Sequence, residues 1–325
     1  MPWEYVSIGS GGTRGSLYLG ALDALETHLE SAAGMGYGEW REQLKGLSGC
    51  SFGSLMVLII GLGIPKKKRA ELMKRFADPR DVVRCPDLSL LMQRYGVEEG
   101  HGMREVIGSV LTAGGLSEHS TLADLKRLLR IEMVFVCTDL KAEAALYLSA
   151  DTHPELKTVD AVFASCCVPF VFTPMKLGDT IVSDGVLTCN LPRVFPEDKT
   201  LFLYLTVDHP RSAPQTWQEF FAKVVSVTTR VQDVAYDTIP PENRLQLKLG
   251  ESLSNLPPFD IDLTARDSKQ FHTQGYWRTL NFLTSHRCEE ALVDVVRFLA
   301  SWSPPTPVVT DEAASDAESD PDTRE

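Results

Sequence analysis

The sequence has no long apolar segment and no excess of positive charge. Its longest apolar run, residues 55–64, has ten residues and includes two glycines, whereas a helix that crosses a bilayer needs about 20. The formal net charge is −12, and nucleic-acid binding requires a basic surface that neutralises phosphates. We therefore expect neither a membrane-spanning helix nor nucleic acid as a partner.

Cysteine patterns typical of disulfides or zinc sites are also missing. The seven cysteines are an odd number without a C-x-x-C pair, and the adjacent Cys166 and Cys167 lack the spacing of zinc ligands. The start, MPWEYVSIGSGG, has neither the basic nor the apolar region of a secretion signal. We expect free thiols, no metal or cofactor, and a cytoplasmic protein that is not secreted.

The composition changes near the end of the chain. The 325 residues are 43% hydrophobic, which is enough to bury a sizeable core. From residue 303 the sequence turns to Pro, Ser, Asp and Glu, and residues 311–325 carry a net charge of −6. Such a segment buries too little apolar surface to fold. We expect one folded domain over residues 1–302 and a disordered acidic tail over 303–325.

Short β-rich runs alternate with segments of helical periodicity. The run 200–207, TLFLYLTV, is apolar enough to be a central strand that is buried on both faces. The alternation predicts an α/β fold with a mainly parallel sheet. The predicted strands are 4–8, 44–48, 131–138, 145–148, 180–183 and 200–207, and the predicted helices are 16–29, 54–62, 66–76, 159–164, 217–236 and 288–302, with a mostly helical region over 78–130.

Residues 49–53 read G-C-S-F-G and fit the G-x-S-x-G pattern of a nucleophile elbow. That motif requires a strand, a tight turn and a helix in this order, and the predicted strand and helix on either side supply them. Gly49 and Gly53 lack the Cβ atoms that would clash in so sharp a turn. Ser51 is therefore a candidate nucleophile at a helix N-terminus. A tight turn with a buried serine is the alternative interpretation.

Two further motifs lie where a strand ends. Residues 9–15, GSGGTRG, lack the third glycine of a dinucleotide fingerprint and the G-K-[ST] of a phosphate loop. They still offer backbone N–H groups that can stabilise an oxyanion, with a flexible turn as the alternative. Asp184-Gly185 follows the strand 180–183, at the sheet edge where α/β sites form. A plain Asp-Gly turn is the alternative there.

Taken in order, these motifs resemble those of the patatin-like phospholipase family. GSGGTRG resembles its glycine-rich loop, GCSFG its serine elbow and DGV its D-G-[GA] carboxylate; residues 164–174, ASCCVPFVFTP, are similar to its A-S-x-x-x-P-x-x-F-x-P segment. The resemblance covers about residues 5–207. It departs from the family pattern at Ser10, where glycine is usual, and at Val186, where glycine or alanine is usual. It implies a three-layer α/β/α fold.

The resemblance also implies an activity and a set of roles. The activity is a lipid acyl hydrolase of the phospholipase A type, which forms an acyl-enzyme at a Ser-Asp dyad. Ser51 would be the nucleophile and Asp184 the proton acceptor. The oxyanion hole would come from Gly11 and Gly12, and the residues that order the loop and shape the elbow would be Arg14, Gly15, Gly49 and Gly53.

Three alternatives stay open at this point. The same dyad could perform acyl transfer or thioester hydrolysis, or the fold could bind lipid without turnover. His209, which follows the strand 200–207, is an alternative base.

The implied partner is a phospholipid or another acyl lipid, so we expect transient, peripheral contact with membranes. The run Lys66-Lys67-Lys68-Arg69 offers positive charge for anionic headgroups, worth about 1 kcal/mol per residue at the surface. The alternative interpretation of this run is a solvated first turn of a helix.

Overall fold

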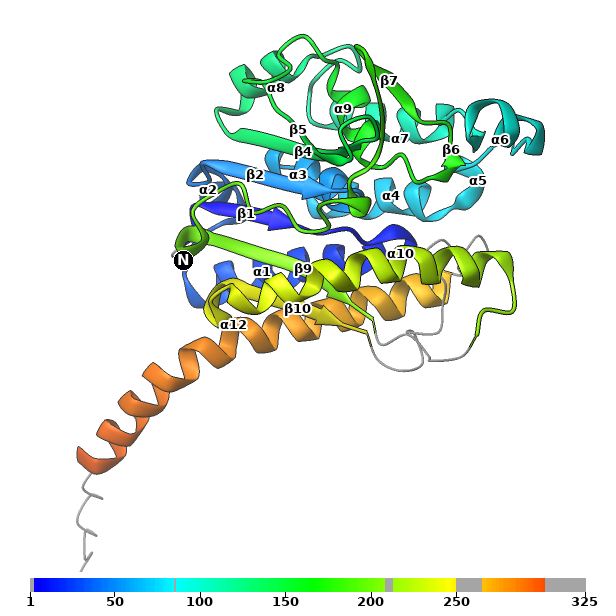
Figure 1. The fold of residues 1–325 in the computed structure, drawn as a ribbon. Helices are drawn as coiled ribbons and strands as arrows, with labels where there is room; N and C mark the ends of the chain where they lie inside the picture. The colour runs from blue at the N-terminus through cyan, green and yellow to red at the C-terminus, as the bar shows by residue number, and fades with distance from the viewer. Residues whose placement is uncertain (1–2, 85, 208–212, 250–264, 302–325) are drawn as a thin grey trace, which may run out of the picture. The chain divides into compact units, whose positions relative to one another are not determined.

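A mixed β-sheet flanked by helices forms the centre of the computed structural model, which describes residues 3–84, 86–207, 213–249 and 265–301 (Figure 1). The eight strands of the main sheet run in the order β10-β9-β1-β2-β4-β8-β7, with β5 also paired to β4. The pairs from β10 to β4 are parallel, whereas β8, β7 and β5 run antiparallel to their neighbours. This arrangement confirms the predicted three-layer α/β/α fold.

The strands have the following bounds: β1 Tyr5–Ile8, β2 Gly46–Cys50, β3 Gly96–Glu98, β4 Glu132–Asp139, β5 Ala144–Leu148, β6 Phe170–Phe172, β7 Met175–Leu177, β8 Thr180–Asp184, β9 Thr200–Thr206 and β10 Arg244–Lys248. The strands β3 and β6 form a separate parallel pair. The strand β9 lies between β1 and β10, and its first five residues are buried, as its apolar sequence predicts.

The α-helices are α1 Ser16–Ala32, α2 Tyr37–Glu42, α3 Phe52–Gly61, α4 Lys66–Ala77, α5 Pro79–Val82, α6 Leu88–Arg94, α7 His101–Ala113, α8 Leu122–Leu129, α9 Thr158–Ser165, α10 Trp217–Asp233 and α12 Ala265–Ser301. Five short 3-10 helices complete the described elements: η1 Gly12–Gly15, η2 Gly185–Leu187, η3 Glu197–Lys199, η4 Val234–Thr238 and η5 Pro241–Asn243. In the described residues no helix combines the length and the apolar character needed to cross a membrane.

The sequence prediction misplaced some elements. The strand predicted over 44–48 lies two residues later, and the helix predicted over 288–302 begins at Ala265. The prediction missed β3, β6, β7 and β10, because strands of three to five residues are too short to show a clear period. The chain divides into a compact unit, Met1–Thr284, and a second unit, Ser285–Glu325. The predicted tail 303–325 lies outside the described residues.

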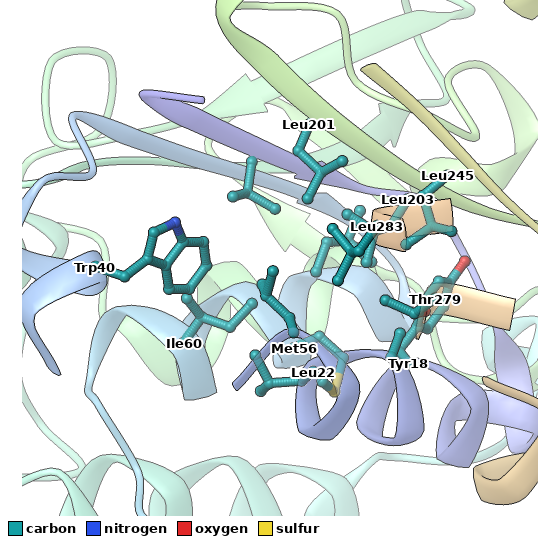
Figure 2. A pocket seen from close by; sticks show the side chains of 14 residues that line it. Tyr18, Leu22, Trp40, Met56, Ile60, Leu201, Leu203, Leu245, Thr279 and Leu283 are labelled. Atoms are coloured by element: carbon teal, nitrogen blue, oxygen red, sulfur yellow. The ribbon is translucent and has the colours of Figure 1, made fainter. Parts of the chain in front are cut away.

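Within the first unit, α1 and the beginning of α12 pack with almost no space between their backbones. A Cβ atom on Gly20 would lie 2.0 Å from the His272 carbonyl oxygen, and one on Gly275 would lie 2.0 Å from the Leu17 carbonyl oxygen. Side chains from these helices, from α2 and α3, and from β1, β9 and β10 line an apolar cavity of about 10 Å³ (Figure 2). A volume this small is at the lower limit for holding one water molecule.

A buried ion-pair network joins α1 to α4 and α12. The fully buried Arg69 guanidinium donates to Asp23 Oδ1 over 3.0 Å and also to Glu26. The second oxygen of Asp23 lies 3.1 Å from His272 Nε2 and 3.4 Å from Lys66 Nζ. Burial raises the pKa of Asp23, but the hydrogen bond with His272 and the positive charges of Lys66 and Arg69 lower it by more, so the carboxyl is ionised at neutral pH. The last residue of the basic run 66–69 therefore serves the fold.

Candidate active site

The candidate nucleophile lies in a strained turn between β2 and α3. Ser51 has φ 54° and ψ −127°, a conformation that non-glycine residues adopt rarely and at a cost. Glycine is required on both sides of it: a Cβ on Gly49 would lie 2.5 Å from the backbone of Gly53, and one on Gly53 would lie 2.2 Å from the Ile8 carbonyl oxygen. The turn is the strand–turn–helix arrangement of a nucleophile elbow.

The structure brings Ser51 and Asp184 together. The hydroxyl of Ser51 donates to Asp184 Oδ2 over 2.6 Å, although 132 residues separate them in the sequence. The strand β4 is responsible, because it pairs with β2 on one side and with β8 on the other: Val136 is opposite Cys50, and the next residue, Cys137, is opposite Asp184. The two residues thus extend from strand ends that are two positions apart in the sheet.

Burial gives the Asp184 carboxyl an unusual pKa. The side chain is fully buried, and removal from water raises its pKa from 3.8 to about 7. Donors partly oppose this shift: the Ser51 hydroxyl binds Oδ2, and the Val186 N–H binds Oδ1 over 2.8 Å. A carboxylate with a pKa near 7 is a far better base than an ordinary aspartate.

The glycine-rich loop packs directly on the elbow. A Cβ on Gly15 would lie 2.0 Å from the ring of Phe52, the residue after Ser51. Gly12 has φ +54°, which favours glycine. In the described part of the chain, the backbone N–H groups of Gly11 and Gly12 donate to no other group. Arg14 is buried, which lowers its pKa to about 10 and leaves it a cation at neutral pH.

The two departures from the family pattern both form structural contacts. Ser10 ties the glycine-rich loop to the segment after Asp184, because its hydroxyl bonds the Asn190 side chain and its N–H donates to the Asn190 carbonyl over 3.2 Å. Val186 is buried, and its N–H is the second donor to Asp184. Neither substitution removes the Ser51–Asp184 hydrogen bond.

Ser165 supports the elbow in a way that the sequence motif did not reveal. Its hydroxyl accepts the Ser51 N–H over 2.9 Å and the Ser54 hydroxyl over 2.8 Å, and it donates to the Val136 carbonyl. The resemblance to A-S-x-x-x-P included this serine but assigned it no role. All of these groups are buried, so each bond compensates for lost contact with water.

Gln232 on α10 holds the segment that follows Asp184, and no sequence motif included this residue. Its amide nitrogen donates to the carbonyls of Val186 and Leu187 over 3.1 and 3.4 Å, and its oxygen accepts the Asn190 N–H over 2.5 Å. The helix is thereby fixed to η2, directly after Asp184. The alternative base His209 lies outside the described residues. Among the described side chains, no group of three or more His, Cys, Asp or Glu is arranged to hold a metal.

Comparison with known proteins agrees with this fold. The family model "Patatin-like phospholipase" matches residues 6–194, more than half of the chain. This match shows that the chain belongs to the patatin-like phospholipase family. The α/β fold, the serine elbow and the buried carboxylate described above are in keeping with that family. Family membership supports lipid hydrolysis as the class of activity. The resemblance inferred from the three motifs is thus confirmed.

A solved structure, VipD, extends the comparison of the fold beyond residue 194. VipD from Legionella pneumophila is 15% identical with a TM-score of 0.56, over 88% of this chain and 67% of VipD. ExoU, in its complex with SpcU from Pseudomonas aeruginosa, is 14% identical with a TM-score of 0.45, over 87% of this chain and 52% of that chain. The chain thus spans about half the length of ExoU. No curated protein sequence matches the chain.

Proposed function

We propose that this protein hydrolyses carboxylic ester bonds of phospholipids through Ser51 and Asp184. The observation that carries the proposal is the 2.6 Å hydrogen bond from the Ser51 hydroxyl to a fully buried carboxylate. A serine hydroxyl is a weak nucleophile until a base takes its proton, and Asp184 Oδ2 is the group in contact with that proton. The raised pKa of Asp184 suits it to this role.

The first half of the reaction forms an acyl-enzyme. Ser51 Oγ attacks the ester carbonyl carbon while Asp184 takes the hydroxyl proton, and the carbonyl oxygen becomes an oxyanion. The N–H groups of Gly11 and Gly12 are the donors we assign to this oxyanion; loss of one such donor typically lowers the rate by about 10²–10³. The intermediate then collapses, and the leaving alcohol, a lysolipid, receives the proton from Asp184.

The second half releases the fatty acid. Water attacks the acyl-enzyme carbonyl, and Asp184 accepts a proton from that water. The second tetrahedral intermediate collapses to free fatty acid, and the proton returns to Ser51 Oγ. Arg14 and Gly15 hold the glycine-rich loop, while Gly49 and Gly53 permit the turn that presents Ser51.

Fatty-acid release from mixed phospholipid vesicles tests the proposal. The wild-type protein, Ser51→Ala and Asp184→Asn are compared in EDTA, and the products are identified. We expect release by the wild type and background release by both variants. A silent wild type on every acyl ester offered would overturn hydrolysis and favour lipid binding. Activity that survives in Asp184→Asn but not in Ser51→Ala would assign the base to another residue, with His209 the next to test.

A further inference from the structure

Two helices of the first unit carry rows of exposed apolar side chains. On α6 and its C-cap, Leu88, Met92 and Tyr95 are 63–85% exposed, and no residue of this helix is buried. On α10, the row is 44–64% exposed and consists of Phe220, Val224 and Val227. Both rows have the spacing i, i+4, i+7, so each forms one stripe along its helix. We call them the α6 stripe and the α10 stripe. Aligned exposed apolar side chains indicate an interaction surface.

The α6 stripe connects to the serine side of the site. The strand β3 begins at Gly96, directly after Tyr95, and Gly96 pairs with Phe170 of β6. Phe170 is itself half exposed and follows Ser165, which holds the Ser51 N–H, by five residues. Five residues span at most about 18 Å. The α6 stripe is thus linked to the elbow through one strand pair and one short segment.

The α10 stripe connects to the carboxylate side. The C-terminal end of α10 is held to the segment directly after Asp184 by Gln232, which makes two hydrogen bonds to η2 and one to Asn190. In Figure 1, α6 and the beginning of α10 lie at the end of the sheet toward which the arrowheads of β1 and β2 point. Because Ser51 directly follows β2, the two stripes lie at the end of the unit that contains the candidate site.

The basic run 66–69 is a poor alternative for membrane contact. Arg69 is buried, Lys66 Nζ lies 3.4 Å from Asp23, and Lys68 Nζ lies 3.1 Å from Glu71. The whole chain carries a net charge of −12, which repels anionic surfaces. Contact with a membrane must therefore come mainly from burial of apolar side chains.

We propose that the α6 and α10 stripes together form a docking surface for a phospholipid bilayer. The inference rests on the proposed function, because a phospholipid substrate resides in a bilayer and not free in water. Docking at these stripes brings the ester bonds to the end of the sheet where Ser51 and Asp184 meet. The bilayer is the occupant that follows from the proposed function, because it is the phase that holds the ester bonds.

Vesicle partition of non-hydrolysing protein tests the docking surface. The Ser51→Ala protein is mixed with phosphatidylcholine vesicles at 0.1 and 0.5 M NaCl, and bound protein is measured by flotation. Two variants change three residues each to glutamine, a good helix former: one at Leu88, Met92 and Tyr95, the other at Phe220, Val224 and Val227. A matched control changes two exposed leucines elsewhere, Leu128 on α8 and Leu140 after β4.

We expect each stripe variant to lower the partition coefficient at least about tenfold, because each removes three side chains from the apolar contact. The control stays within about twofold, and salt has little effect, since apolar burial is not screened. Circular dichroism checks folding; if a triple variant unfolds, the single changes Met92→Gln and Val227→Gln, at the most exposed position of each stripe, replace it.

Three results would overturn the docking surface. They are equal partition of the stripe variants and the control, binding that disappears at 0.5 M NaCl, and a wild-type dimer in sedimentation that the stripe variants convert to monomer. The last would assign the stripes to self-association. Because the experiment uses inactive protein, its result is independent of the fatty-acid assay. If the wild type releases no fatty acid but the stripe variants still lower the partition coefficient, only the proposed hydrolysis is overturned. If the wild type is active but the stripe variants partition like the control, only the docking surface is overturned.

Discussion

The main-chain N–H of Ser51 donates to the hydroxyl of Ser165 over 2.9 Å, so α9 holds the residue whose side chain contacts Asp184. The bond satisfies a buried donor in a strained turn and fixes the direction of the Ser51 side chain. Because the Ser51 N–H is occupied, the oxyanion donors must come from elsewhere, and the N–H groups of Gly11 and Gly12 are available. Positioning of the nucleophile thus depends on a residue 114 positions away.

Ser165→Ala should lower kcat about tenfold or more with little change in KM. It leaves the Ser51 N–H buried without an acceptor, which also costs about 1–3 kcal/mol of stability. The matched control is Ser54→Ala, because Ser54 bonds the same Ser165 hydroxyl but leaves the Ser51 contact intact. Its kcat should stay within about twofold. Equal losses in both variants would show that the serine cluster matters only for folding.

The rate should depend on the ionisation of Asp184. Only the carboxylate can accept the Ser51 proton, and burial raises its pKa to about 7. For a soluble ester, log(kcat/KM) should therefore rise with unit slope below about pH 7 and level off above it, since this parameter reports the free enzyme. A midpoint near pH 4, the ordinary value for aspartate, would show that Asp184 is hydrated or is not the base.

Asp184→Asn should be inactive yet more stable than the wild type at pH 8. Folding raises the pKa of Asp184 from 3.8 to about 7. The contribution of Asp184 to the free energy of unfolding is therefore most favourable below pH 3.8 and is lost as the pH rises through 7. At pH 8 the wild type buries a charge that asparagine lacks, and at pH 5 the carboxyl is mostly neutral. In urea unfolding, the difference in the free energy of unfolding between Asp184→Asn and the wild type should be larger at pH 8 than at pH 5. An equal difference in stability at both pH values would contradict the raised pKa of Asp184.

The sequence was enough to predict those parts of the candidate site that depend on a single short segment of the chain. The turn around Ser51 shows as two glycines that flank a serine between a strand and a helix, and Asp184 shows as a carboxylate at a strand end. Both signals arise because a tight turn or a strand end restricts which residues fit locally. Their order along the chain was enough to indicate the family, which the comparison confirmed.

Contacts between distant segments could not be predicted in the same way. Ser165 and Gln232 act through hydrogen bonds to residues 114 and 42–46 positions away, and neither side chain has a local pattern that marks its partner. Arg69 shows the same limit, because a basic run predicts solvent or headgroup contact while tertiary packing buries its last residue. Such pairings depend on the fold and leave no signal in one sequence.

Gln232→Glu should lower kcat about tenfold while KM for a soluble ester changes little. Glutamate keeps the acceptor for the Asn190 N–H but loses the donors to Val186 and Leu187, and its charge then faces two carbonyl oxygens. The segment that carries the Val186 donor to Asp184 is thereby displaced. The acid limb of the pH profile should shift upward, because the Val186 N–H stabilises the carboxylate.

The matched control for this change is Gln246→Glu. Gln246 lies on β10, is exposed, and its side-chain amide donates to the Thr206 hydroxyl, so the change introduces the same charge away from η2. Its kcat and pH profile should match the wild type. Equal effects of both variants would show that added negative charge, and not the loss of the Gln232 contacts, lowers the rate.

Thr279→Val should increase the free energy of unfolding by about 1 kcal/mol. The Thr279 hydroxyl is buried at the apolar cavity of about 10 Å³ and has no hydrogen-bond partner in the described part of the chain (Figure 2). Valine has nearly the same shape and removes the cost of an unsatisfied hydroxyl. Thr273→Val on the same helix is the control, since Thr273 is exposed and its hydroxyl bonds the Lys269 carbonyl, so its effect should stay below about 0.5 kcal/mol. Urea unfolding measures both. A loss of stability in Thr279→Val would mean that the cavity holds a water molecule bonded to the hydroxyl.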